Sequence, residues 1–349
     1  MAIALAKSYT RLLDEVYKAA SVTSDLVTPP DLMQAGANAK EILYPQIVVG
    51  GLGDYDRASG YTTGAVDVAW KSATFNYDRG TKIQVDTQDD QETFNIAFGK
   101  ASAELIRTRV APESDAFAFA SWAALSNISK VSSGVTYAGG AEFLTALLAA
   151  VNTMDEDEVP SEERYLFATP TLLNGIMALD TTKSREVLAS FARAVKVPQS
   201  RFYTAIDMLD GKTAGEEAGH YTRAGEGVGA WEAATAYVLG DKVRGGNNVF
   251  VCSTAGTSGA AAPTWSTAAP VADGAGNLEW TYVGPYGLDI NFMIVHKPAV
   301  IKFDKHVASS IILPENNPDA DGYIVKYRKY GLVDGYENKR AGIYLSHKA

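Results

Sequence analysis

The sequence changes character between Val228 and Gly284, and this change limits what the chain can fold into more than any other feature. The segment is rich in Gly, Ala, Thr and Trp and has no helical periodicity, whereas the sequence on either side is typical of a mixed α/β protein. A stretch of this size survives inside another domain only where the host backbone is exposed and the two ends of the gap lie close together. We therefore predict a small inserted domain at 228–284.

Composition excludes several classes of protein. The chain has 349 residues, 46% of them hydrophobic, which is enough for a sizeable core. Its net charge of −10 argues against a protein whose main task is to grip a nucleic-acid backbone, although not against one that surrounds nucleic acid. The single cysteine, Cys252, excludes an internal disulfide and a cysteine metal site. We find no membrane-spanning run and no signal-peptide pattern, and expect folding in a reducing cytosol.

The N-terminal third predicts extended elements without a core of their own. Residues 1–20 have helical spacing, and an irregular arm follows to residue 57. Residues 58–90 alternate as strands do, and we predict a long polar hairpin there with its turn at residues 78–80. Such a hairpin is marginal alone, so arm and hairpin must pack on the rest of the fold or on a neighbouring chain.

The remaining host sequence alternates between helical and strand-like segments. An Ala-rich helix opens with Pro112 in its first turn and has apolar residues around much of its circumference, so we expect it to be buried on several sides. Strands and helices occur in runs, which predicts an α+β fold. The other expected elements are helices near 90–105, 143–151, 170–177 and 183–194, strands at 164–168 and 290–295, and a strand pair at 324–333 and 341–345.

No catalytic or metal-binding motif is present. The four histidines form no HExxH, and G-x-S-x-G and Walker A patterns are absent. Residues 225–230 match a permissive dinucleotide pattern but follow a polar stretch, so a flexible hinge into the insert explains them better. The acids at 155–158 are consecutive rather than alternating, which indicates a solvated loop and not a Ca²⁺ site. We expect no cofactor, no metal and no enzymatic activity.

The order of the pieces resembles the major capsid protein of tailed bacteriophages, the Hong Kong 97-type shell fold. The resemblance covers the whole chain except the insert. It is carried by segments similar to the family's spine helix, axial domain and closing strands: Arg109–Phe117, Val159–Pro160, Arg164–Phe167, Thr169–Pro170, Ile290–Val300 and Tyr336–Tyr344.

The resemblance implies an anatomy and a function. The anatomy is an arm at 1–57, an extended loop at 58–90, a peripheral domain with the spine helix at 91–135 and 300–349, an axial domain at 136–227 and 285–299, and the all-β insert at 228–284. The implied subunit assembles with copies of itself into the hexamers and pentamers of an icosahedral virion shell. The shell encloses double-stranded DNA without sequence-specific binding, assembles in the bacterial host cytoplasm, and works with portal and scaffolding proteins.

Some members of this family crosslink a hairpin lysine to a neighbouring subunit. Lys71 and Lys82 fall in the expected hairpin, but nothing in the sequence shows the catalyst or acceptor that such a bond needs. We interpret both as solvated surface lysines and predict no crosslink.

The insert resembles small all-β modules related to chitin-binding carbohydrate modules, with strands expected at 237–244, 248–254 and 278–283. Trp231, Trp265 and Trp280 either stack on sugar rings or form the core, and the small size of the module favours the core. Displayed on the outer surface of a shell, the insert would bind surface glycans weakly. Two alternatives stay open: an encapsulin-like protein compartment, and a carbohydrate-binding protein acting through the insert.

Overall fold

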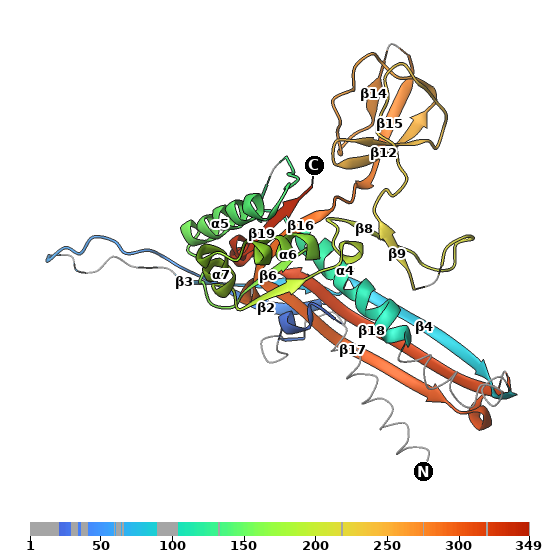
Figure 1. The fold of residues 1–349 in the computed structure, drawn as a ribbon, viewed down its shortest axis with the longest axis horizontal. Coiled ribbons are helices and arrows are strands. Elements are labelled where there is room, and N and C mark those ends of the chain that lie inside the picture. Colours follow the sequence, from blue (N-terminus) through green and yellow to red (C-terminus); the bar gives the residue numbers. More distant parts are fainter. Residues whose placement is uncertain are drawn as a thin grey trace.

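A computed structural model describes residues 21–28, 34–35, 41–58, 60, 64, 66–88, 104–131, 133–217, 219–274, 276–318 and 320–348. The helix expected within residues 1–20 lies outside these residues, as does the helix expected near 90–105 except for residues 104–105, which are helical. A central body carries three projections: a hairpin on one side, a long sheet on the other, and the insert at one end (Figure 1).

The body is built on a five-stranded sheet in the order β5-β19-β16-β6-β7. The central strand β16 is buried along its whole length and alternates between two layers. Phe292 and Ile294 face one hydrophobic cluster, and Met293 and Val295 face another. The strands are β5 (Ser129–Lys130), β6 (Arg164–Ala168), β7 (Arg193–Lys196), β16 (Ile290–His296) and β19 (Ile343–His347).

Helices cover both faces of this sheet. On one side α5 (Gly140–Glu156) and α6 (Pro170–Leu179) contribute Phe143, Leu147 and Ile176 to the core, and α7 (Thr182–Ala189) follows. On the other side α4 (Ala111–Ala123) is buried around most of its circumference, as the sequence predicts. A five-residue π-helix, η3 (Ile106–Val110), precedes α4. The predicted helix at 183–194 is too long, because it ends at Ala189 and residues 193–196 form β7.

A second sheet consists of three long antiparallel strands: β17 (Val300–Ile312), β18 (Gly322–Gly335) and β4 (Tyr77–Asp86), in the order β17-β18-β4. The predicted turn at residues 78–80 is wrong, since these residues lie inside β4 and pair with β18. Gly80 is needed for close packing instead, because a Cβ there would lie 2.9 Å from the carbonyl oxygen of Tyr327. The predicted strand pair at 324–333 and 341–345 is also wrong, because β18 pairs with β17 whereas β19 pairs with β16.

The projecting hairpin is formed by different strands from those expected. Strand β3 (Val66–Thr74) pairs with β2 (Glu41–Val49), which also pairs with the short β1 (Gln34–Ala35). The predicted hairpin of residues 58–90 is therefore wrong in its pairing, since β4 belongs to the second sheet. Asn76 separates the two strands: its amide donates to the carbonyl of Val333 at 2.8 Å and accepts from the same residue's N–H at 3.0 Å. These two bonds tie the junction between β3 and β4 to β18.

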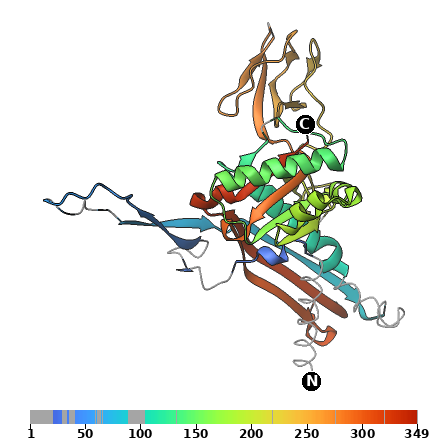
Figure 2. The ribbon, with the colours of Figure 1, turned by 60° about the vertical axis from the view of Figure 1, so that its left-hand side comes forward.

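Residues 230–285 contain strands and turns but no helix among the residues described (Figure 2). They form their own hydrophobic cluster around Phe250, Leu278 and Trp280. The ends of the segment meet where the N–H of Gly287 donates to the carbonyl of Ala224 at 2.9 Å, next to the β8–β9 pair (Ile206–Met208 and Tyr221–Arg223). The strands are β10 (Ala236–Tyr237), β11 (Lys242–Gly245), β12 (Asn248–Thr254), β13 (Gly256–Thr257), β14 (Val271–Asp273) and β15 (Leu278–Pro285).

Candidate functional site

The β2–β3 hairpin carries an apolar stripe along one face. Residues that pair directly across two antiparallel strands point to the same side, and three consecutive alternate pairs are apolar on both strands. These pairs are Pro45 with Trp70, Ile47 with Val68, and Val49 with Val66. The five large side chains among them are 49% to 66% exposed. We call these six residues the apolar stripe.

The opposite face of the hairpin is mixed in character. There Gln46 pairs with Ala69, and Val48 pairs with Asp67. A ribbon that is apolar on one side only is typical of an element with one covered face, yet no residue within the described ranges covers the stripe. Contiguous exposed apolar surface of this kind marks an interaction site. The hairpin is therefore incomplete in the isolated chain.

The root of the hairpin, by contrast, is firmly packed. Ile42, Tyr44 and Ala73 are buried against Leu332 of the second sheet. The ring of Tyr44 meets that of Tyr336 edge-on at 5.0 Å, and burial raises the pKa of the Tyr44 hydroxyl. The body thus fixes the direction of the hairpin and leaves its outer part unsupported.

The two predicted surface lysines lie in different strands and have different surroundings. Lys71 lies in β3 and forms an ion pair with Glu337 at 3.1 Å, with its side chain half-exposed. Lys82 is exposed in β4, directly opposite Lys326 of β18. Neither lysine lies within the apolar stripe.

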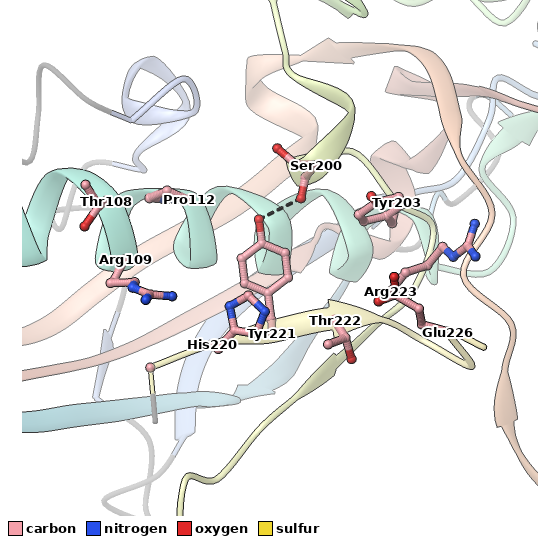
Figure 3. A pocket seen from close by; sticks show the side chains of 11 residues that line it. Thr108, Arg109, Pro112, Ser200, Tyr203, His220, Tyr221, Thr222, Arg223 and Glu226 are labelled. Atoms are coloured by element: carbon pink, nitrogen blue, oxygen red, sulfur yellow. Dashed lines mark hydrogen bonds between the residues drawn. The ribbon is translucent and has the colours of Figure 1, made fainter. Parts of the chain in front are cut away.

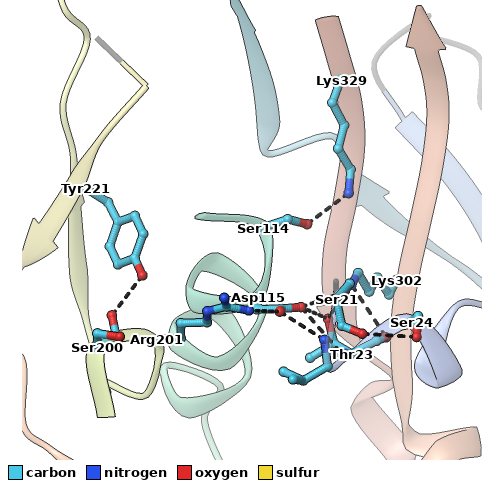
Figure 4. A network of polar contacts seen from close by, with 11 residues as sticks. Ser21, Thr23, Ser24, Ser114, Asp115, Ser200, Arg201, Tyr221, Lys302 and Lys329 are labelled. Carbon is cyan, nitrogen blue, oxygen red and sulfur yellow. Dashed lines mark hydrogen bonds and ion pairs between the residues drawn. The ribbon is translucent and has the colours of Figure 1, made fainter. Parts of the chain in front are cut away.

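A buried polar network holds residues 21–23 to the body (Figure 4). The carboxylate of Asp115, in α4, is fully buried and accepts hydrogen bonds from the hydroxyls of Ser21 at 2.7 Å and Thr23 at 2.6 Å. It also accepts from the N–H of Val22 at 3.0 Å and pairs with Arg201 at 3.3 Å. A carboxylate that accepts this many bonds is well satisfied, so α4 fixes residues 21–23.

Two buried lysines complete this network from the second sheet. Lys302 donates to the hydroxyl of Thr23, and burial lowers its pKa to about 8, while the nearby Asp115 charge opposes that shift. Lys329 donates to the hydroxyl of Ser114 at 2.8 Å and pairs with Asp304 at 3.2 Å. Burial lowers the pKa of Lys329 as well. The N-terminal residues, α4 and the second sheet are thereby joined by buried charges, none of which the sequence pattern indicated.

A cavity of about 260 Å³ lies between the start of α4 and the β8–β9 pair (Figure 3). Tyr221 donates from its hydroxyl to the carbonyl of Ser200 at 2.8 Å, and burial raises its pKa to about 12. Arg109 is held by Glu217 at 2.6 Å. These contacts join a hydroxyl to a carbonyl and an arginine to a carboxylate, so they do not activate a nucleophile. Over the described parts of the chain, no three His, Cys, Asp or Glu side chains gather as a metal site, and none of the helices there is long and apolar enough to cross a membrane.

The three tryptophans of the insert occupy different positions. Trp280 is fully buried and donates to Asp273 at 2.9 Å, so it offers no face to a sugar ring. Trp231 is half-buried and donates to the same carboxylate oxygen at 2.7 Å. Trp265 is half-buried and packs on Phe250, with ring centroids 4.4 Å apart. Glycan stacking stays a prediction for Trp231 and Trp265.

Comparisons with known proteins find similarity in structure but not in sequence. No protein-family model matches the chain, and no curated protein matches it. The capsid structure of the cyanophage P-SCSP1u is similar with a TM-score of 0.50 and 13% identity, over 95% of this chain and 88% of that chain. A Mycobacterium phage Che8 structure gives 0.49 and 11%, over 93% and 90%. A virus-like particle from Pyrococcus furiosus gives 0.49 and 6%, over 97% and 98%. The cyanophage likeness shows that this chain has the α+β fold of Hong Kong 97-type capsids.

Proposed function

We propose that the chain is the major capsid protein of a tailed bacteriophage, and that copies of it form the hexamers and pentamers of an icosahedral shell around double-stranded DNA. The role is structural rather than enzymatic. The capsid-type fold supports this proposal, and the apolar stripe carries it. A subunit whose projecting limb exposes six apolar side chains in register lowers its free energy by covering them with another copy.

The geometry of the proposed contact between the apolar stripe and a second copy favours a closed shell. The stripe lies on a limb that points away from the body (Figure 2). In the proposed shell it meets a different surface on its neighbour. Contacts between unlike surfaces are heterologous, and they close into rings when the rotation between copies allows it. Rings of such subunits are the capsomers of the proposed shell.

The insert supports a display role. It leaves the body at the Ala224–Gly287 contact and projects away from both the hairpin and the second sheet (Figure 1). We assign it to the outer surface of the shell, where Trp231 and Trp265 are the candidates for weak glycan contact. Portal and scaffolding proteins complete the proposed set of partners.

Electron microscopy of the purified chain tests the proposal. We expect closed shells of uniform size after expression in a bacterial cytoplasm. A compact monomer at high protein concentration would refute the proposal. The nature of the contents separates a phage capsid from the alternative compartment: nuclease-protected DNA in particles from infected cells supports the capsid, and a folded protein cargo supports an encapsulin-like shell.

A further inference from the structure

The junction between the insert and the body is packed around one tyrosine. Tyr286 follows β15, where the chain leaves the insert. Arg223 and Arg244 both lie over its ring, with their guanidinium carbons 5.4 Å and 4.4 Å from the ring centroid. Arg223 belongs to β9 of the body, and Arg244 belongs to β11 of the insert. Because a cation over the face of an aromatic ring is attracted to it, this ring joins the two parts of the chain.

The segment that enters the insert packs on the same ring. Gly225 has a φ of +69°, which favours glycine, and a Cβ there would lie 2.9 Å from Cδ2 of Tyr286 and 2.6 Å from Cγ2 of Val249. Val249 is a buried residue of β12 in the insert. The sequence favours a flexible hinge at residues 225–230, but close packing and backbone conformation are what require a glycine at position 225.

The segment that leaves the insert binds both parts of the chain. The N–H of Tyr286 donates to the carbonyl of Asn247 in the insert at 2.8 Å, and the next N–H, that of Gly287, donates to Ala224 of the body at 2.9 Å. A Cβ at Gly287 would lie 2.4 Å from the carbonyl oxygen of Ala205. Two consecutive residues are therefore fixed to the insert and to the body.

Further contacts hold the two arginines in place. Arg223 pairs with Asp289 of the body at 3.9 Å. The side chain of Arg244 donates from Nε to the carbonyl of Gly246 at 2.9 Å, and its backbone N–H donates to Gly229 at 2.7 Å. Gly229 lies on the entering segment, so Arg244 binds one connection through its backbone and the other through its guanidinium. The two connections cannot move apart without breaking one of these contacts.

We propose that Arg223, Gly225, Arg244, Tyr286 and Gly287 form a rigid mount that holds the insert at one fixed angle to the body. Parts of a chain joined by a small interface move relative to each other by default, whereas here the contacts fix both connections at once. The inference goes beyond the proposed function, because it concerns the single chain. In a shell, every copy of the insert would then present the same surface to a multivalent target.

Pulsed electron paramagnetic resonance tests the mount by measuring how widely the insert moves. Spin labels are attached at Thr145→Cys, an exposed position of α5, and at Leu239→Cys, an exposed position of the insert, with Cys252→Ser removing the native thiol. Labelled chains are diluted with unlabelled chains, so that only distances within one chain are measured. We expect a narrow distance distribution for the native junction and one about two-fold wider for Tyr286→Ala, whose connections behave as a flexible linker.

Two control variants separate loss of the ring from general damage. Tyr286→Phe keeps the ring and should keep the narrow distribution, because attraction of a cation to the ring does not require the hydroxyl. Arg107→Ala with Arg185→Ala removes two exposed arginines outside the mount and should also leave the distribution narrow. Thermal unfolding of each variant checks that the chain is folded.

Two results would overturn the mount. One is an equal width for the native junction and for folded Tyr286→Ala. The other is a native distribution as wide as that of a chain with a flexible Gly-Ser segment inserted after Gly284. Should Tyr286→Ala fail to fold, Arg223→Ala with Arg244→Ala provides the same test. None of these results depends on the formation of shells, so failure of the mount and failure of the proposed function are distinguishable.

Discussion

The insert and the hairpin differ in how far they bury their own apolar side chains. Both project from the body, but the insert buries Phe250, Leu278 and Trp280 completely, whereas the hairpin leaves Ile47 and Val68 about half-exposed or more. The insert folds back on itself through several short strands, so its aromatic side chains meet. A two-stranded ribbon cannot close around its own face. One limb therefore buries its apolar side chains within the chain, and the other leaves them exposed.

Removing the core of the insert should produce the largest change in the stability of the unassembled chain. Trp280→Ala deletes a fully buried side chain and leaves Asp273 with one tryptophan donor fewer. We expect a loss of about 3–5 kcal/mol, confined to the insert. Hydrogen exchange should show faster exchange in residues 230–285 alone, and shells should still form. Loss of shells would contradict the separation of the two limbs.

Removing the anchor of residues 21–23 should reduce the stability of the chain nearly as much. Asp115→Ala removes the buried carboxylate that accepts from the hydroxyls of Ser21 and Thr23 and pairs with Arg201. We expect a loss of about 3–5 kcal/mol, because removing one partner strands buried charge. Urea unfolding measures the loss, and Glu162→Gln at an exposed acid is the control. An unchanged midpoint would show that the network is not formed in solution.

The change in the free energy of unfolding with pH should be smaller, and its sign is defined. The folded-state pKa of Lys302 is about 8, below its ordinary value of 10.5. Between these values the folded chain has released the proton while the unfolded chain still binds it, so stability rises with pH across that window. We expect the native chain to gain up to about 1.4 kcal/mol per pH unit relative to Lys302→Met. Thermal unfolding from pH 8 to 10 measures the gain, and parallel curves for the two proteins would contradict it.

Changes to the apolar stripe should affect the unassembled chain least. Ile47→Ser with Val68→Ser alters exposed positions, and we expect a stability change within about 0.5 kcal/mol. Shell formation should nevertheless be lost, which sedimentation detects. The matched control is Val238→Ser with Leu239→Ser, two apolar residues of the insert that are somewhat more exposed, and this variant should leave assembly intact. Equal effects of the two pairs would remove the distinction between the limbs.

Sequence reasoning predicts local elements well and their partners less well. The Pro at the start of α4 and the continuous apolar run of β16 are local signals, and both elements appear as expected. Strand β17 was missed because buried Lys302 and the charged residues around it obscure its pattern. The burial of Lys302 depends on Thr23 and Asp115, which are far away in sequence, and no local pattern contains that information.

In the candidate site, too, the local elements are easier to predict than their partners. Alternation in residues 41–49 resembles alternation in residues 66–74, but β3 could have paired with β2 or with β4 on that basis alone. In the structure Asn76 lies between β3 and β4 and binds Val333 of β18, a contact that strand alternation does not reveal. In the insert, the sequence favoured a core role for the tryptophans, and Trp280 has one. The part played by Asp273, which accepts from Trp231 and Trp280, has no signature in spacing.

The single hydrogen bond between Gly287 and Ala224 has a practical consequence for how this protein can be altered. The backbone leaves the host and returns to it at this one place, so the two host segments on either side of the β module lie next to each other. A foreign polypeptide with similarly adjacent termini could be grafted at this point, and in the proposed shell every subunit would then carry a copy of it.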